Sequence, residues 1–426
     1  MHIRLALCSI LLTVGLASVA QTARQLVSDN PALAASNYLA YPAPTKPLTK
    51  APRGYKPFYI SHYGRHGSRW HIGTDSYSYP FLVLDSARQA GALTPFGQDV
   101  CRRLSVVNQA ASKRFGELTR LGHEQHAAIA DRMFHRFPEV FRGATHVDAK
   151  STVVIRCILS MTAETQRLSE LNPDLVIVQD ASEHDMFYMN AKTDDLKHVL
   201  SRGKSLVQDF SAKHTHPERL INALFADSAY AAIHVSKTRL FQYLFRVACN
   251  QQSLDFDFNF DDLFADDERY DLWQCTNASW YVDYCNSPAT LGLAPYRQRA
   301  LLQNILDTAD SCVVSPRCNV TLRFGHEVCV LPLVCLMELD DSNVSVENLD
   351  ELADKWQNFR YYPMASNVQL IFYRTRRATD DILVKVLLNE NEARLPIDSD
   401  FAPYYRWRDV EAFYRRKLAS FSLSEQ

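Results

Sequence analysis

The run Phe58-Tyr59-Ile60-Ser61-His62-Tyr63, followed after one glycine by Arg65-His66-Gly67-Ser68-Arg69, decides the predicted fold of this 426-residue chain. The first part is apolar and aromatic enough for a buried strand, and the second part is a polar loop at the carboxyl end of that strand. Open α/β sheets bind their ligands at the carboxyl ends of their strands. The segment therefore predicts a strand that carries a reactive loop to a ligand site.

The loop places one histidine between two arginines. A neutral imidazole can attack phosphorus, and planar guanidinium groups can hold the phosphoryl oxygens around it. Gly67 allows the backbone to approach a ligand closely. This pattern indicates phosphoryl transfer through a phosphohistidine, a covalent route that divides one difficult step into two. The alternative interpretation is a solvated basic turn with a structural histidine.

Composition is that of an ordinary globular protein, with 47% hydrophobic and 22% charged residues. The length suggests two or three domains, or one large domain with an insertion. A formal net charge of -2 gives no reason to expect a nucleic-acid partner. An anionic small-molecule substrate would have to be attracted by a local basic pocket.

Residues 1–20 resemble a secretory signal peptide. His2 and Arg4 form a short basic start, residues 5–17 are apolar, and Ser18-Val19-Ala20 offers a small-x-small cleavage pattern. The apolar run is too short for a membrane helix, and no later segment is apolar enough to cross a bilayer. We therefore expect an exported protein, periplasmic or fully secreted, that has no membrane span after the signal is removed.

Ten cysteines are present, and removal of the signal peptide would leave nine. Export permits disulfides, and the close pairs Cys275 with Cys285 and Cys312 with Cys318 are the expected ones. An odd total leaves at least one free thiol or an intermolecular link. No Cys-x2-Cys spacing occurs, so no zinc site of that type is predicted.

Alternating apolar strands and amphipathic helices predict a mostly parallel α/β sheet flanked by helices. Residues 21–57 are expected to pack over the surface as a leader. The core is expected to comprise residues 21–184 and 311–426, and the aromatic, locally acidic range 185–310 is expected to form an inserted, mainly helical cap. The expected strands are 58–63, 152–155, 175–178, 320–324 and 368–374, with a hairpin from 382–388 and 393–395, and the expected helices include 123–137, 160–171 and 328–337.

Three of the expected strand ends carry groups that suit one site. Arg65, His66 and Arg69 follow the first strand, Arg156 follows 152–155, and His326-Glu327 follows 320–324. If these strands are parallel neighbours, the groups converge on one crevice. His66 would attack phosphorus, while Arg65, Arg69, Arg156 and His326 would hold the phosphoryl oxygens. Glu327 would protonate the leaving oxygen and then activate water. Taken singly, Arg156 could be a surface residue, and His326 and Glu327 could cap a helix.

These elements resemble the histidine phosphatase superfamily, in its acid phosphatase and phytase branch. The matching parts are the loop at 65–69, the segment 151–160 with Arg156-Cys157, the Leu-Thr-x-x-Gly elements at 93–97 and 118–122, and Phe324-Gly325-His326-Glu327. The run from Ser68 to Arg103 is most similar to multiple inositol polyphosphate phosphatases. The resemblance implies an α/β core with a helical cap, a phosphohistidine intermediate, no metal and no cofactor. It makes His66 the nucleophile, Arg65, Arg69, Arg156 and His326 the phosphate clamp, and the carboxylate beside His326 the proton donor.

One departure from the family pattern concerns that carboxylate. The branch usually has His-Asp at this place, and inositol polyphosphate phosphatases often have His-Ala-Glu, whereas this chain has His326-Glu327 with no intervening residue. The reach of Glu327 to the leaving oxygen therefore differs from both patterns. We expect Glu327 to serve as the proton donor nevertheless.

Other patterns are interpreted without a function. Gly203-Lys204-Ser205 lacks the first glycine of a phosphate-binding loop, because position 198 is histidine. Asp255, Asp257 and Asn259 imitate the start of a calcium loop, but Phe260 stands where that loop needs glycine. The glycosylation sequons at 277, 319 and 343 are taken as incidental.

The sequence thus predicts an exported phosphomonoesterase that acts on inositol polyphosphates such as phytate. One alternative is a histidine acid phosphatase of broader specificity, for sugar phosphates or bisphosphoglycerate. Another is a non-catalytic anion-binding protein on the same fold, for which loss of His66 or Glu327 would be expected, and both are present.

Overall fold

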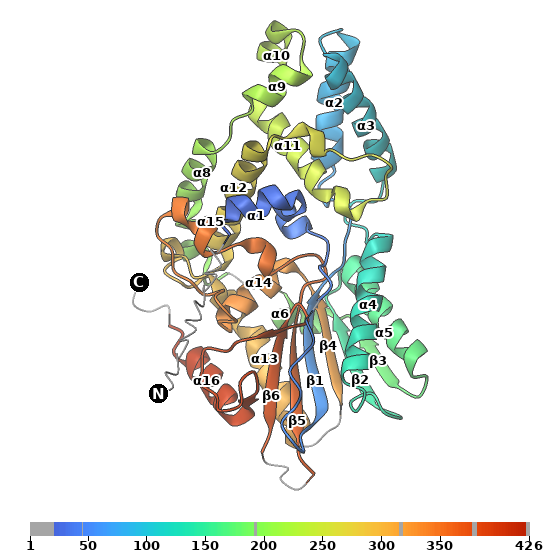
Figure 1. The fold of residues 1–426 in the computed structure, drawn as a ribbon, viewed down its shortest axis with the longest axis vertical. Coiled ribbons are helices and arrows are strands. Elements are labelled where there is room, and N and C mark those ends of the chain that lie inside the picture. Colours follow the sequence, from blue (N-terminus) through green and yellow to red (C-terminus); the bar gives the residue numbers. More distant parts are fainter. Residues whose placement is uncertain (1–20, 45, 191–193, 315–317, 377–380, 423–426) are drawn as a thin grey trace, which may run out of the picture.

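A computed structural model describes residues 21–44, 46–190, 194–314, 318–376 and 381–422, so the expected signal peptide lies outside the described residues. An eight-stranded sheet organises the described part, with order β3-β2-β4-β1-β5-β6-β7 and with β8 paired to β6 (Figure 1). The strands are β1 (Lys56–Arg65), β2 (His146–Ser151), β3 (Val176–Asp180), β4 (Val320–Gly325), β5 (Asn367–Arg374), β6 (Leu383–Leu388), β7 (Asn391–Ala393) and β8 (Tyr405–Arg406).

Strand direction divides the sheet into two halves. Strands β3, β2, β4 and β1 are mutually parallel, β5 runs antiparallel to β1, and β6 runs antiparallel to β5. Strand β6 therefore has the same direction as β1 to β4. Strands β7 and β8 are each antiparallel to β6, so five of the eight strands point one way and three the other. The predicted mostly parallel α/β sheet is confirmed. A hairpin is confirmed, but its second strand is β7 at 391–393 instead of 393–395. Its turn consists of Asn389 and Glu390, with φ of 49° and 62°.

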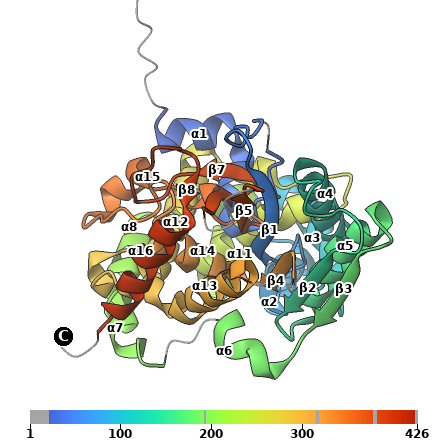
Figure 2. The same cartoon turned by 90° about the horizontal axis from the view of Figure 1, so that it is seen from below.

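Helices cover both faces of the sheet, which explains why every residue of β4 is buried. One face packs on α4 (Arg120–Arg136) and α5 (Ile155–Leu171) through residues such as Ile129 and Met161. The opposite face packs on α13 (Arg299–Val314), α14 (Glu327–Leu336) and α16 (Trp407–Ala419). Figure 2 shows the two helical layers on either side of the strands.

A third hydrophobic cluster lies beyond the end of the sheet, in the upper part of Figure 1. It joins helices from the two ranges expected to form core and cap, and α11 (Lys237–Asn250) packs on α2 (Asp75–Gln89). The division of the chain at residues 185 and 310 stays a prediction. The leader contributes α1 and η1, whose Val27 and Ala34 are buried in the same cluster. The elements are α1 (Ala23–Asp29), η1 (Pro31–Tyr38), α2 (Asp75–Gln89), α3 (Pro95–Ala111), α8 (Lys204–Lys213), α9 (Glu218–Leu224), α10 (Ser228–His234), α11 (Lys237–Asn250) and α12 (Asp266–Tyr284).

The predicted strand at 152–155 is wrong. The strand of this region is β2, which ends at Ser151, and α5 begins at Ile155. The β-branched run misled the prediction because Val153 and Ile155 are exposed, at 40% and 73%, instead of forming a buried strand. Arg156 consequently lies in the first turn of a helix and not directly after a strand.

The predicted disulfides are also absent, since none of the nine described cysteines forms a disulfide. Cys275 lies within α12 and Cys285 at its carboxyl end. Ten residues of helix separate the two by about 15 Å, which is beyond the reach of a disulfide. Cys312 in α13 and Cys318 before β4 are likewise unpaired thiols. Within the described residues, no helix has the length and apolar character needed to cross a membrane.

Candidate active site

The parallel pairing of β1 with β4 brings the two histidine-bearing segments together. Arg65 is in register with Gly325, and the backbone N–H of His66 donates to the carbonyl oxygen of Gly325 at 3.0 Å. The imidazole rings of His66 and His326 consequently lie with their centroids 5.7 Å apart. Strand adjacency, and not closeness in the sequence, therefore builds the site.

His66 is fully buried, and its ring is held in one orientation. Its Nδ1 lies 2.9 Å from the carbonyl oxygen of Gly67. Since a carbonyl can only accept, Nδ1 carries the hydrogen and Nε2 keeps its lone pair. Burial lowers the pKa of His66 well below its usual value, although the neighbouring Glu327 opposes the shift. The imidazole is therefore neutral, with Nε2 available as a nucleophile.

Three arginines with unused donors belong to this site: Arg65 and Arg69 lie beside Glu327, and Arg156 lies beside His326. Arg65 donates through one terminal nitrogen to the carbonyl oxygen of Tyr362 at 2.8 Å, and Arg69 donates to the carbonyl oxygen of Trp70 at 3.0 Å. The Nε of Arg69 and Arg156 and a second terminal nitrogen of Arg65 are buried and have no hydrogen-bond partner among the described residues. The Nε of Arg65 is instead in an ion pair with the Glu327 carboxylate. Burial lowers the pKa of Arg65 to about 10, which leaves it charged at neutral pH.

Unused buried N–H donors are rare in folded proteins and call for an explanation. Here three such donors belong to the positively charged side chains of Arg65 and Arg69, which lie beside Glu327, and of Arg156, which lies beside His326. An anion with several oxygen acceptors, such as a phosphoryl group, would satisfy them.

His326, which follows β4, contacts Arg156 of α5 and Thr152, the residue after β2. The Arg156 guanidinium lies 3.4 Å from Nδ1 of His326, and the Thr152 hydroxyl lies 3.4 Å from its Nε2. Because Arg156 can only donate, Nδ1 accepts and Nε2 carries the hydrogen. Burial lowers the pKa of His326 to about 4, so this ring is also neutral.

Glu327 begins α14 and turns its carboxylate toward the arginines. Oε2 lies 3.1 Å from Nε of Arg65 and 3.4 Å from Nε2 of His66, and Oε1 lies 3.7 Å from a terminal nitrogen of Arg69. Burial raises the pKa of Glu327, but the charged guanidinium groups of Arg65 and Arg69 outweigh burial and hold the pKa well below its usual value. Glu327 is therefore a carboxylate bound to the same guanidinium groups that would hold an anionic ligand.

A metal ion is a second ligand that this region could hold in geometric terms. Ligand atoms of His66, His326 and Glu327 all lie within 4.8 Å of one another. Neutral imidazoles and a carboxylate suit a transition metal. The three adjacent guanidinium groups would repel a cation, however, and they favour an anion at the same place.

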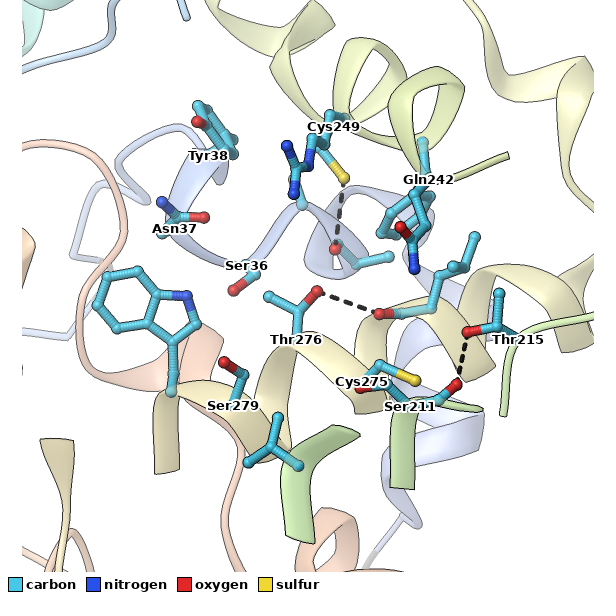
Figure 3. A pocket seen from close by; sticks show the side chains of 17 residues that line it. Ser36, Asn37, Tyr38, Ser211, Thr215, Gln242, Cys249, Cys275, Thr276 and Ser279 are labelled. Atoms are coloured by element: carbon cyan, nitrogen blue, oxygen red, sulfur yellow. Dashed lines mark hydrogen bonds between the residues drawn. The ribbon is translucent and has the colours of Figure 1, made fainter. Parts of the chain in front are cut away.

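A cavity of about 400 Å³ has Tyr38 among its lining residues (Figure 3). It is enclosed by η1, α8, α11 and α12, and the side chains that Figure 3 labels are mainly hydroxyl, amide and thiol groups. Tyr38 stands at its boundary with the site, because the Cζ atom of Arg69 lies 5.2 Å from the Tyr38 ring centroid. Nε2 of His71 donates to the carbonyl oxygen of Arg246, so its Nδ1 accepts from the Tyr38 hydroxyl at 3.0 Å.

The structure thus brings together every residue that the sequence suggested for the site: Arg65, His66, Arg69, Arg156, His326 and Glu327. Their roles stay predictions. The sequence analysis missed Tyr38, because it lies in the leader and no pattern links that segment to the arginines.

Comparison with known proteins identifies the fold. No protein-family model and no curated protein sequence matches the chain. A multiple inositol polyphosphate phosphatase from Bifidobacterium longum, solved with inositol hexasulfate, superimposes with a TM-score of 0.75 at 18% identity, over 89% of this chain and 97% of that one. This chain has the histidine phosphatase fold.

Two phytases share the histidine phosphatase fold with this chain. The phytase from D. castellii has a TM-score of 0.70 at 11% identity and covers 95% of this chain and 89% of its own. The Hafnia alvei phytase has a TM-score of 0.54 at 12% identity, over 86% and 98%. The resemblance inferred from the motifs is therefore confirmed as a likeness of fold to the acid phosphatase and phytase branch.

Proposed function

We propose that this protein is a phosphomonoesterase that works through a phosphohistidine on His66. The three buried, unpartnered guanidinium N–H donors of Arg65, Arg69 and Arg156, in the same site as the neutral Nε2, carry the proposal. They match the charge spread over the three equatorial oxygens during phosphoryl transfer. A protein that only bound anions would have no use for a neutral, oriented imidazole among the arginines.

In the first step Nε2 of His66 forms a bond to phosphorus while the bond from phosphorus to the ester oxygen breaks. The leaving oxygen takes a proton from Glu327. In the second step water attacks the phosphorus and gives its proton to Glu327, the bond from phosphorus to Nε2 breaks, and His66 returns to the neutral state. Arg65, Arg69 and Arg156 hold the phosphoryl oxygens in both steps.

Glu327 must gain a proton before it can act as the acid. Its pKa is held low by the guanidinium groups of Arg65 and Arg69 when these groups face the carboxylate. A phosphate dianion between the arginines neutralises their field and adds negative charge beside Glu327, and both effects raise the carboxyl pKa. Substrate binding itself therefore prepares the acid.

The favoured substrates are inositol polyphosphates. Support comes from the fold, which is shared with an inositol polyphosphate phosphatase and with phytases. The alternative is a broader phosphatase for sugar phosphates, and the largely neutral lining of the cavity that includes Tyr38 favours it. Export to the periplasm or the medium remains part of the proposal and rests on the pattern of residues 1–20.

The test is the release of inorganic phosphate from inositol hexakisphosphate and from a sugar phosphate, by the native protein and by His66→Ala. We expect release from the inositol ester at the higher kcat/KM and none from either substrate by His66→Ala. A higher value on the sugar phosphate would favour the alternative substrate. A native protein that binds phosphate but hydrolyses neither ester would contradict the enzymatic proposal.

A further inference from the structure

One peptide group connects the nucleophile to helix α4. The backbone N–H of Ser68 donates to Oε1 of Gln125 at 2.8 Å. The carbonyl of the same peptide belongs to Gly67, and it is the acceptor for Nδ1 of His66 at 2.9 Å. Gln125 therefore accepts from the N–H, and His66 donates to the carbonyl, of the same Gly67–Ser68 peptide group.

The planarity of this peptide makes the two contacts interdependent. In a trans peptide the N–H and C=O bonds lie in one plane and point in opposite directions. When Gln125 fixes the direction of the Ser68 N–H, it also fixes the direction of the Gly67 carbonyl. The Gln125 side chain is only 7% exposed, and its Nε2 also donates to the Ser68 hydroxyl at 3.0 Å. Two bonds thus secure the amide that orients the plane.

Neighbouring contacts hold the rest of the loop in place. The Gly67 N–H donates to the Ser160 hydroxyl at 3.1 Å, and the Ser68 carbonyl accepts from Thr119. A Cβ on Gly67 would lie 2.4 Å from the Gly122 carbonyl oxygen, so the loop lies directly against the start of α4. The orientation of the 67–68 peptide is therefore set at close range by α4.

The need for such a restraint comes from Glu327. Its Oε2 lies 3.4 Å from Nε2 of His66, and a carboxylate at that distance favours the tautomer with hydrogen on Nε2. That tautomer has no lone pair at the nitrogen that faces the arginines. Among the residues that the structure describes, the Gly67 carbonyl on the other side of the ring is the hydrogen-bond partner that favours hydrogen on Nδ1. The reactive tautomer therefore depends on how firmly that carbonyl is held.

We infer that Gln125 is a positioning residue for the nucleophile: it holds the Gly67–Ser68 peptide so that His66 keeps its hydrogen on Nδ1 and presents Nε2 as the attacking atom. The catalytic consequence rests on the proposed phosphohistidine function, but the tautomer itself does not. The Ser68 N–H needs an acceptor oxygen at the end of a side chain as long as glutamine. Glutamate at position 125 provides this oxygen and preserves the peptide orientation, whereas methionine does not.

The experiment compares Gln125→Met with Gln125→Glu in the full-length protein. The ring nitrogens of His66 are observed by NMR after ¹⁵N-histidine labelling and are assigned through His66→Gln. We expect Gln125→Met to shift His66 toward the Nε2–H form and to lower kcat about 100-fold, the order of loss that a small misplacement of reacting groups causes. Sulfate affinity should stay the same because the arginines remain, and Gln125→Glu should restore both the tautomer and kcat.

Gln357→Met is the matched control for stability. Gln357 is buried to a similar degree, at 6% exposed, and its Nε2 donates to the Ala353 carbonyl oxygen away from the loop. It should lower thermal stability without a change in the His66 signals. An unchanged tautomer in Gln125→Met would overturn the inference, and so would a kcat loss that the control reproduces. If the phosphatase proposal fails but the inference holds, the native protein is inactive and Gln125→Met still shifts the His66 tautomer.

Discussion

Oε2 of Glu327 lies 3.4 Å from Nε2 of His66, so the proposed acid and the proposed nucleophile are in direct contact. The same oxygen lies 3.1 Å from Nε of Arg65. A phosphoryl group bonded to Nε2 of His66 would occupy the position of the Glu327 carboxylate. It would also bind the same guanidinium groups, those of Arg65 and Arg69. Glu327 therefore competes with the substrate for the arginines, and binding must displace it.

Anion binding should consequently be accompanied by proton uptake. Sulfate is a suitable probe because its own charge is constant near neutral pH. The low pKa of Glu327 rises when sulfate takes its place between the arginines, and a proton is taken up wherever pH lies between the two pKa values. Calorimetric titration in buffers of different ionisation enthalpy measures this uptake. In Glu327→Gln the uptake should vanish and sulfate should bind more tightly. Weaker binding would show that the carboxylate does not compete.

Glu327→Gln should also separate good from poor leaving groups. An alkoxide, such as that of an inositol ring, needs a proton when it departs, whereas an aryl oxide does not. General acid catalysis contributes about 10²- to 10⁴-fold, and we expect a loss of that order on alkyl phosphates with aryl phosphates largely spared. Steady-state rates on both substrate types test this. Equal loss on both would remove Glu327 from the role of proton donor.

Glycine at position 67 is required by the packing of the loop against α4. An added Cβ would meet the backbone of Gly122 at 2.4 to 2.8 Å, and a backbone cannot move aside as a flexible side chain can. Gly67→Ala should therefore displace His66 and reduce kcat by about 100-fold or more. Gly73→Ala is the control, because its Cβ would meet only the side-chain ends of Asp75 and Ser76 at 3.1 Å. Retained activity in Gly67→Ala would mean that the loop tolerates this shift.

The sequence predicted the central strands because β-branched and aromatic runs at 58–63, 320–324 and 368–374 are buried on both faces. It failed at 152–155, where a run of the same residue types is largely exposed. Hydrophobicity alone does not distinguish these two cases.

The site residues were predictable because they follow recognisable strands. His66 and His326 each follow an apolar strand, and parallel neighbouring strands end at one edge of a sheet. The contacts of Tyr38 and Gln125 were not predictable, since they depend on how η1 and α4 pack against the loop. No periodicity in the chain encodes that packing.

Buried neutral histidines should make the fold sensitive to acid. Burial lowers the pKa of His62 to about 4, against about 6.5 in the unfolded chain. Between these values the unfolded chain binds a proton that the folded chain excludes, so stability falls as pH decreases from 6.5 to 4. One such histidine accounts for about 3 kcal/mol of unfolding free energy over this window.

Urea unfolding at pH 7 and at pH 4.5 measures this dependence. His62→Gln should lose less stability between the two pH values than the native protein does. His135→Gln, at an exposed position of α4, should lose as much as the native protein. An undiminished pH dependence in His62→Gln would exclude His62 as a source of the acid sensitivity.

A covalent bond between phosphorus and Nε2 of His66 is the centre of this account. Rapid mixing with a ³²P-labelled phosphomonoester, an alkaline quench to preserve phosphohistidine, and mass spectrometry of the peptide that contains residue 66 test it directly. We predict transient label on His66, attached through Nε2, that is absent in His66→Ala and persists longer in Glu327→Gln because water is not activated. Turnover at the native rate with no label on His66 would contradict the account.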